Sequence, residues 1–241
     1  LFPDARLTVD HSVTFGGFYC EVEGRAPFTP VELAQIEARM REIVALDEPI
    51  RKQRAPLADA IELFHRRGEE DKVRLLRHRN KSYLVLYEMR GYAGYFHGYM
   101  TPSAGYVPYF NLHPYDPGFI LRFPTRRQNT ALEPVVEYPK LVAVFREYGQ
   151  TLRLLGVQDV GALNDAILAD RTGEIILVAE ARHEQRIARI ATQIAEHHEQ
   201  LRLVLIAGPS SSGKTTFSKR LAVQLLANGV RPIAVELDNY F

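Results

Sequence analysis

The first sixty residues combine a strand-like pattern with a helical one. β-rich stretches on either side of Gly16-Gly17 predict a hairpin over residues 7–23. The segment Thr29-Pro-Val-Glu then supplies an N-cap hydroxyl, a proline at the first helical position and a glutamate that can bond the cap amide. Apolar residues follow at spacings of three and four: Leu33, Ile36, Met40, Ile43 and Val44. This spacing predicts a helix with one buried face.

The next part of the chain favours a second helix over residues 57–67 and then short β-like runs, broken by Gly and Pro, between Lys81 and Phe123. Tyrosines crowd this second stretch: Tyr83, Tyr87, Tyr92, Tyr95, Tyr99, Tyr106, Tyr109 and Tyr115. Such rings could stack on bases, as in single-strand binders. Half-buried sheets also prefer aromatic residues, and we favour packing as the explanation.

A polar, proline-flanked segment over residues 124–134 indicates a domain boundary. Helical periodicity follows it over residues 138–155, 159–168 and 174–198. We therefore expect a first domain over residues 1–125, a helical linker over 126–199 and the start of another domain over 200–241. The sequence contains no internal repeat.

The last forty residues predict a phosphate-binding loop between two strands. Residues 201–207 form an almost continuous apolar run, as in a parallel strand covered on both faces. Residues 208–215 read Gly-Pro-Ser-Ser-Ser-Gly-Lys-Thr and fit the Walker A pattern G-x-x-x-x-G-K-[ST] at each fixed position. A helical pattern follows, and residues 231–237 form a second apolar run. This order predicts the start of an α/β P-loop domain with a parallel sheet.

The residue types of the loop match what a nucleoside triphosphate such as ATP requires. Gly208 and Gly213 let successive backbone amides point inward as an anion-binding nest. Lys214 can reach the β and γ phosphates, and the Thr215 hydroxyl can complete the coordination of Mg²⁺. Further donors are expected from Ser210, Ser211, Ser212 and Thr216.

Asp238 follows the second apolar run directly. Since ligands of doubly wound sheets bind at the carboxyl ends of strands, its carboxylate could accept a proton from an attacking hydroxyl. An aspartate after a strand also commonly starts a turn by bonding its own backbone. The residues alone leave both roles open.

Composition excludes several classes of protein. Lys and Arg total 30 against 29 Asp and Glu, so a formal net charge of +1 gives no overall attraction to nucleic acid or anionic membrane. The single cysteine, Cys20, cannot form an internal disulfide, and no apolar stretch is long enough to span a bilayer. These features favour a cytoplasmic protein with no membrane partner. The first and last residues fall inside patterned segments, so we expect an interior portion of a longer protein.

Residues 206–217 and 235–241 together resemble the bacterial uridine kinase and phosphoribulokinase family. The resemblance implies an ATP-dependent kinase that transfers the γ-phosphoryl group to the 5′-hydroxyl of a nucleoside, with uridine as the expected substrate. In such an enzyme Asp238 is the general base and Lys214 stabilises the transferred phosphoryl group, with Mg²⁺ as cofactor. This portion alone is expected to be inactive. A sugar-phosphate kinase similar to phosphoribulokinase is an alternative.

The N-terminal part resembles the second, editing domain of threonyl-tRNA synthetase. The resemblance rests on residues 2–8, Gly17-Phe-Tyr, residues 28–40 and residues 60–64, and it implies an α+β domain over residues 1–125. The Cys and His of that family's editing motif fall on Phe96 and Met100, which cannot perform hydrolytic chemistry. Nearby His97 is expected to be a surface or packed histidine.

A hypothesis from another class is a nucleotide-gated protein that binds tRNA or another RNA. A cluster of basic residues motivates it: Lys72, Arg74, Arg77, His78, Arg79 and Lys81. Clusters of this kind are also common on solvated surfaces. The oligomeric state and the present role of the synthetase-like domain stay open.

Overall fold

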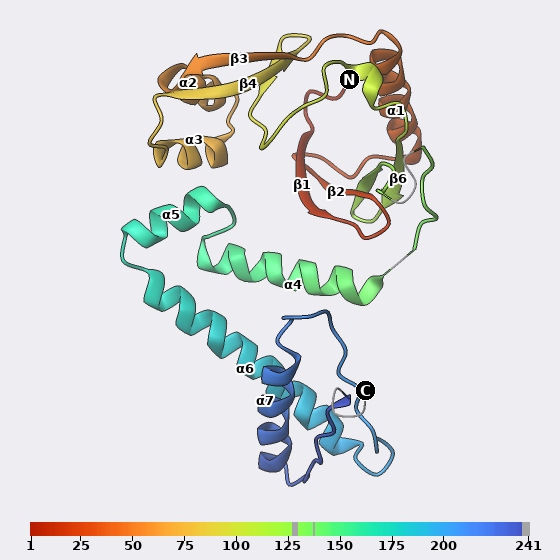
Figure 1. Cartoon of the computed structure of the whole chain (residues 1–241), viewed down its shortest axis with the longest axis vertical. Helices are drawn as coiled ribbons and strands as arrows, with labels where there is room; N and C mark the ends of the chain where they lie inside the picture. Colours follow the sequence, from red (N-terminus) through yellow and green to blue (C-terminus); the bar gives the residue numbers. More distant parts are fainter. Residues whose placement is uncertain (127–129, 137, 238–241) are drawn as a thin grey trace. The chain divides into compact units, whose positions relative to one another are not determined.

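The structure is a computed structural model of the 241-residue chain, and it describes all residues except 127–129, 137 and 238–241 (Figure 1). The chain divides into two compact units, Leu1–Ala162 and Leu163–Phe241. Both sheets of the described residues are antiparallel, so the chain is a mixed α and β protein. None of the helices in these residues has the length and apolar character needed to cross a bilayer. The division at residues 125 and 199 stays a prediction.

The first unit contains a four-stranded antiparallel sheet in the order β1-β2-β7-β6. Its strands are β1 (Arg6–Ser12), β2 (Gly17–Glu23), β6 (Asn111–Tyr115) and β7 (Gly118–Arg122). β1 pairs with β2 from Arg6 opposite Glu23 to Ser12 opposite Phe18, which confirms the predicted hairpin. Gly16 turns this hairpin at φ +88°, where a Cβ would lie 2.5 Å from the carbonyl oxygen of Phe123, so no larger residue fits.

Helix α1 (Pro30–Ala45) covers one face of this sheet and begins where the sequence predicts. The amide of Thr29 donates to Glu32 Oε2 at 2.8 Å, and the amide of Glu32 donates to Thr29 Oγ1 at 3.3 Å. This capping box satisfies two amides that have no partner within the helix. Leu33 is buried against Cys20, Phe28 and Phe119, which confirms the predicted apolar face.

A second sheet, in the order β3-β4-β5, is also antiparallel. Its strands are β3 (Arg51–Pro56), β4 (Tyr83–Met89) and β5 (Tyr92–Gly94). The predicted helix over residues 57–67 is confirmed as α2 (Leu57–Arg66), and α3 (Glu70–Arg77) follows it. Both helices pack on one face of the sheet through a buried cluster: Ala60, Phe64, Val73, Leu76, Leu84, Leu86 and Ala93. A short 3-10 helix, η1 (Ala104–Tyr106), lies between β5 and β6.

The helices predicted over residues 138–155, 159–168 and 174–198 are confirmed as α4 (Pro139–Leu155), α5 (Val160–Leu168) and α6 (Thr172–Glu196). α4 ends at Gly156, whose φ of +69° lies in the left-handed region that is common at helix C-termini. α4 packs on the first sheet, since the ring of Phe145 stacks on His11 with centroids 4.1 Å apart. An Arg146 guanidinium nitrogen also donates to the carbonyl of Asp116 at 2.6 Å.

In the second unit, α6 packs against α7 (Lys214–Ala227), as Figure 1 shows. Ile187 and Ala191 of α6 are buried with Leu221 and Leu225 of α7. The strands predicted over residues 201–207 and 231–237 are not formed in the described residues, so no parallel sheet exists there. An apolar run becomes a strand only when its backbone groups find a ladder partner, and the described part of this unit offers none.

Candidate functional site

The predicted phosphate loop adopts a conformation suited to an anion. It leads directly into α7, with Gly213 at the N-cap in the left-handed region at φ +81°. Ser211, two residues earlier, also has positive φ, at +60°. Alternation of left-handed and right-handed residues turns successive amides toward one side of a loop and creates an anion-binding nest. Such a nest is one backbone feature that a phosphate site requires.

The side chains of Lys214 and Ser212 lie next to Gly208 in this loop. The Lys214 ammonium donates to the carbonyl oxygens of Gly208 and Pro209, each at 2.9 Å, so the charge lies directly on the loop. A Cβ at Gly208 would lie 2.6 Å from Ser212 Oγ and would close the loop interior. The remaining predicted donors of this loop, Ser210, Ser211, Thr215 and Thr216, are exposed. The residues present therefore fit a phosphate group.

The structure leaves two predicted roles untested. Asp238, the predicted general base, lies outside the described residues. In the ranges that the structure does describe, no three His, Cys, Asp or Glu side chains form a group able to hold a metal ion. The assignment of Thr215 as a Mg²⁺ ligand stays a prediction.

The positions that the resemblance assigns to the editing motif carry no polar chemistry. Phe96 packs beside Tyr87, with ring centroids 6.5 Å apart, and Met100 is partly exposed. His97 is exposed, as expected for a surface histidine. None of these side chains offers a nucleophile next to a base.

The basic cluster on and after α3 is largely used by the fold itself. Lys72 pairs with Glu69, and a guanidinium nitrogen of Arg74 lies 2.7 Å from Asp159 Oδ2. Burial of Asp159 opposes its ionisation, but hydrogen bonds from Arg74 and from backbone amides outweigh burial and lower its pKa. Arg79 donates to the carbonyl of Tyr83 at 3.1 Å. This cluster is therefore a weaker RNA-binding surface than its sequence suggests.

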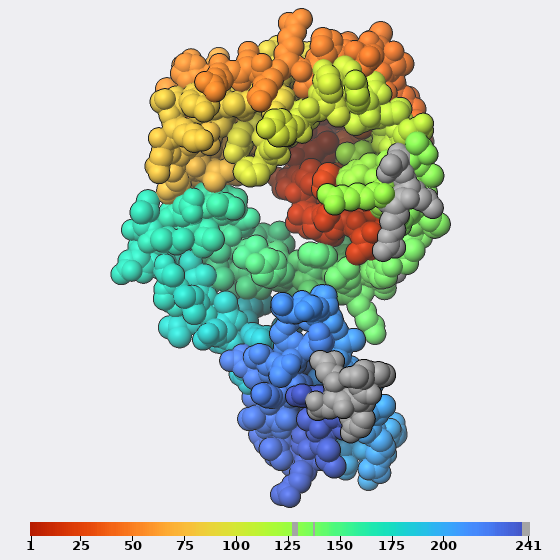
Figure 2. Space-filling view, viewed as in Figure 1, coloured from red at the N-terminus to blue at the C-terminus, as the bar shows by residue number. Residues whose placement is uncertain are grey.

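A different set of cations is paired with aromatic rings and not with carboxylates. Lys52 Nζ lies 5.4 Å from the ring centroid of Tyr99, and Arg54 Cζ lies 4.6 Å from that of Tyr83. Neither cation forms an ion pair with a carboxylate in the described part of the chain. Figure 2 shows orange atoms of the β3 region at the surface of the first unit, near yellow-green atoms of the segment after β5. We name the set of Lys52, Arg54, Tyr83 and Tyr99 the β3 surface.

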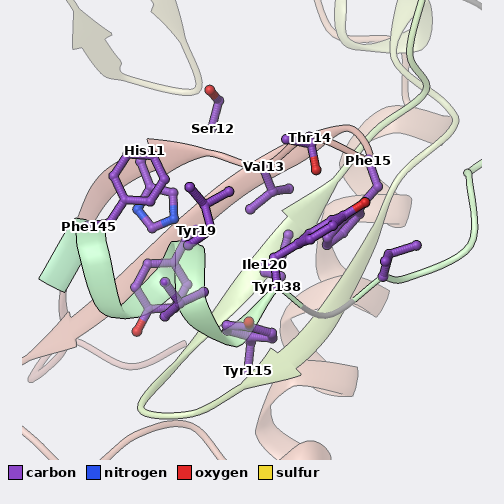
Figure 3. Close-up of a pocket in the computed structure, with 13 residues that line it drawn as sticks. His11, Ser12, Val13, Thr14, Phe15, Tyr19, Tyr115, Ile120, Tyr138 and Phe145 are labelled. Atoms are coloured by element: carbon purple, nitrogen blue, oxygen red, sulfur yellow. The ribbon is translucent and has the colours of Figure 1, made fainter. Parts of the chain in front are cut away.

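A small pocket lies between the first sheet and α4 (Figure 3). Six of its 13 lining residues have aromatic rings: His11, Phe15, Tyr19, Tyr115, Tyr138 and Phe145. Burial raises the pKa of the Tyr19 hydroxyl, and His11 Nδ1 lies 2.6 Å from Asp10. The cavity volume of about 30 Å³ leaves room for roughly two water molecules. A nucleotide does not fit in this space.

Sequence reasoning missed both the β3 surface and the pocket. Lys52 and Tyr99 are far apart in the chain, and only the pairing of β3 with β4 and the path of the loop after β5 bring them together. The available signal was the polar run Arg51-Lys-Gln-Arg, which ends three residues before the start of α2 at Leu57. The tyrosines were recognised, but packing explains only some of them, because Tyr99 is 93% exposed.

Comparisons with known proteins point to tRNA ligases. No protein-family model matches the chain. A threonine–tRNA ligase of Xanthomonas euvesicatoria pathovar vesicatoria is 33% identical over 114 residues, which make up 46% of this chain. Threonine–tRNA ligases of a Geobacter species and of Paracidovorax citrulli are 34% identical over 112 and 113 residues. The matched part corresponds to 18% of the length of each relative.

These findings support a threonyl-tRNA synthetase-like module in the N-terminal half and correct the kinase prediction. The relatives are named as tRNA ligases, and the described sheets are antiparallel, without the parallel sheet of a P-loop kinase. The predictions of a uridine kinase, of a P-loop phosphotransferase and of a nucleoside partner are therefore wrong. The prediction rested on residues 206–217 and 235–241. A phosphate loop by itself specifies phosphate binding and not the acceptor of a transfer.

Proposed function

We propose that the protein binds tRNA or a related RNA through its N-terminal module, in a manner controlled by a nucleoside triphosphate on the loop over residues 208–215. The observation that carries the proposal is the identity of about one third with threonine–tRNA ligases over 114 residues. Those relatives are named for an activity on tRNA. The module resembles an editing domain, yet Phe96 and Met100 replace its reactive pair, which favours binding without hydrolysis.

The phosphate loop supplies the controlling site in this proposal. Its ligands to the triphosphate of ATP are the residues predicted from the motif: Gly208, Ser210, Ser211, Ser212, Gly213, Lys214, Thr215 and Thr216. Lys214 would exchange its two carbonyl partners for phosphate oxygens, which are stronger acceptors because they are charged. Thr215 would hold a Mg²⁺ ion that comes with the nucleotide. The left-handed Gly213 and the closely approached Gly208 support this role.

Control by a nucleotide is a statement about coupled equilibria. If ATP changes the affinity for RNA, RNA must change the affinity for ATP by the same factor. Couplings between two sites typically alter affinity by about 5- to 150-fold, so a moderate effect is expected here. As part of this proposal we place the activity in the cytoplasm, because the single cysteine of the sequence, Cys20, cannot form an internal disulfide.

A filter-binding assay with bulk tRNA tests both parts of the proposal. The logarithm of the affinity for tRNA should fall linearly with the logarithm of the salt concentration, because cations of the protein replace counterions on the phosphates. Addition of MgATP should change the affinity, and Lys214→Ala should abolish that change while tRNA binding without ATP persists. Lys219→Ala, an exposed lysine of the same helix, is the matched control and should retain the ATP effect.

The outcomes separate the two parts. Absence of tRNA retention at low salt, or retention that salt does not weaken, would remove the RNA-binding role. If tRNA retention depends on salt but does not change when MgATP is added, the RNA-binding role stands and the controlling role of the loop is removed. Calorimetry of the protein with MgATP would then show whether the loop binds the nucleotide at all.

A further inference from the structure

One face of the second sheet is covered by α2 and α3. On the opposite face, the loop after β5 buries Tyr87, which is 7% exposed, while Lys52 and Arg54 are exposed, and we call this second face the open face. Leu84 and Leu86 of β4 point into the core beneath α2 and α3. Because side chains alternate along a strand, Tyr83, Val85 and Tyr87 point to the opposite face. The register pairs Lys52 with Tyr87 and Arg54 with Val85, so both cations of the β3 surface also lie on the open face.

The open face continues onto β5 and the loop that follows it. Tyr87 pairs with Gly94, so Gly94 belongs to the open face. A Cβ at Gly94 would lie 2.8 Å from the ring of Phe96, which shows that this ring lies close against the glycine backbone. The Tyr87 hydroxyl donates to the carbonyl of Gly98 at 3.2 Å and holds the loop that presents Tyr99.

The result is a set of accessible rings beside cations that have no carboxylate partner. Tyr99 and Phe96 are 93% and 45% exposed. Lys52 and Arg54 are two residues apart on an extended strand, which places them about 7 Å from each other. This spacing is comparable to that of neighbouring phosphates along an extended nucleic acid strand. Charged residues on an edge strand also discourage aggregation, but that role does not require the rings.

We propose that the open face of the second sheet holds a single-stranded segment of RNA, with bases on Tyr99 and Phe96 and phosphates on Lys52 and Arg54. The inference rests on the proposed RNA-binding function and names the surface and the form of RNA. Bases in a duplex keep their faces stacked on each other, whereas unpaired bases stack on protein rings. An acidic peptide would satisfy the cations and leave the rings without a specific partner.

Fluorescence anisotropy with a labelled 12-nucleotide oligouridylate, measured on the full chain, tests the assignment. Tyr99→Leu keeps an apolar side chain and removes the π face, and it should weaken binding by roughly 5- to 150-fold. Lys52→Gln should reduce the slope of log affinity against log salt by about 0.7, as expected for one lost phosphate contact with a single strand. Tyr99→Leu should leave that slope unchanged. The two variants therefore report stacking and charge separately.

Matched controls come from exposed residues outside this face. Tyr148→Leu on α4 removes a tyrosine that is 62% exposed, and Lys140→Gln removes a lysine of the same helix. Neither should alter the affinity or the salt slope. Far-ultraviolet circular dichroism of each variant verifies the fold. A duplex of the same length should bind less tightly than the single strand, and a polyglutamate peptide should not compete.

Failure of this inference differs from failure of the proposed function. If tRNA and oligouridylate bind but Tyr99→Leu and Lys52→Gln match the wild type, the open face is not the RNA surface although RNA binding stands. If Lys52→Gln weakens binding and Tyr99→Leu does not, or if polyglutamate competes, the face is a general anion surface and base stacking is overturned. If no RNA binds, both the proposed RNA-binding function and the assignment of the open face as its surface are wrong.

Discussion

Phe64 holds the second sheet against its helices, and its truncation tests the fold on which the RNA surface depends. The side chain is completely buried on α2 and packs in a cluster that includes Leu76 of α3 and Leu84 of β4. The Glu69 amide also donates to the Phe64 carbonyl at 3.0 Å, which fixes the turn into α3. Because its neighbours belong to separate elements, a cavity left here cannot close by a small shift of one side chain.

The expected cost of Phe64→Ala is about 3–5 kcal/mol of unfolding free energy. Transfer of a buried phenylalanine to water accounts for about 1.5–3 kcal/mol, and the unfilled cavity contributes most of the rest. For a unit of this size each kcal/mol lowers Tm by about 2–4 °C, so a decrease of at least about 6 °C is expected.

Urea unfolding followed by circular dichroism measures this cost. The two units can unfold separately, so the transition of each is fitted on its own. Phe96→Ala is the control, since its partly exposed ring should contribute less than about 1 kcal/mol. Equal costs for the two variants, or a cost below 1 kcal/mol for Phe64→Ala, would refute the packing of α2 and α3 on this sheet. Loss of oligouridylate binding in Phe64→Ala without unfolding would show that the core positions the open face.

Three further predictions concern local features. Thr29→Ala should cost about 1 kcal/mol in thermal or urea unfolding, whereas Thr29→Ser should keep the cap. The pKa of Asp159 is lowered in the folded state, so the stability from its bond to Arg74 is present above the unfolded pKa and is lost as pH falls through the folded pKa. In the variant Asp159→Asn, the free energy of unfolding should therefore depend less on pH below about pH 4. Gly208→Ala should abolish MgATP binding in calorimetry by filling the loop interior, while Gly173→Ala, where a Cβ meets nothing within 4 Å, should leave it unchanged.

Features that depend on neighbouring residues were predictable from the sequence. The capping box of α1 needs only Thr29 and Glu32, three residues apart, and the structure confirms it. The left-handed cap at Gly156 and the start of α7 at Lys214 are equally local. In each case the residues that determine the geometry lie within one helical turn, so the pattern contains the whole cause.

Features that depend on a distant partner were not predictable in the same way. β3 is polar and mostly exposed, and its strand conformation comes from the ladder with β4. For residues 201–207 the sequence predicts a strand that the structure does not form. Their apolar run has strand propensity but no ladder partner in the described residues. Leu205 there is 79% exposed. Propensity specifies the conformation that a segment tolerates, whereas pairing decides whether the segment adopts it.

The same distinction explains why the motif misled the functional prediction. The phosphate loop is a local pattern, and its geometry agrees with phosphate binding, but an acceptor substrate is chosen by side chains that converge from distant segments. In the first unit, residues from distant segments do form contacts between cations and rings: Lys52 with Tyr99, and Arg54 with Tyr83. The ring of Phe96 packs beside that of Tyr87. An editing site would need a nucleophile or a base where Phe96 and Met100 stand. A ring at that position removes hydrolysis and adds a surface for a base, so one substitution is consistent with both the loss of editing chemistry and the RNA-binding role that we propose.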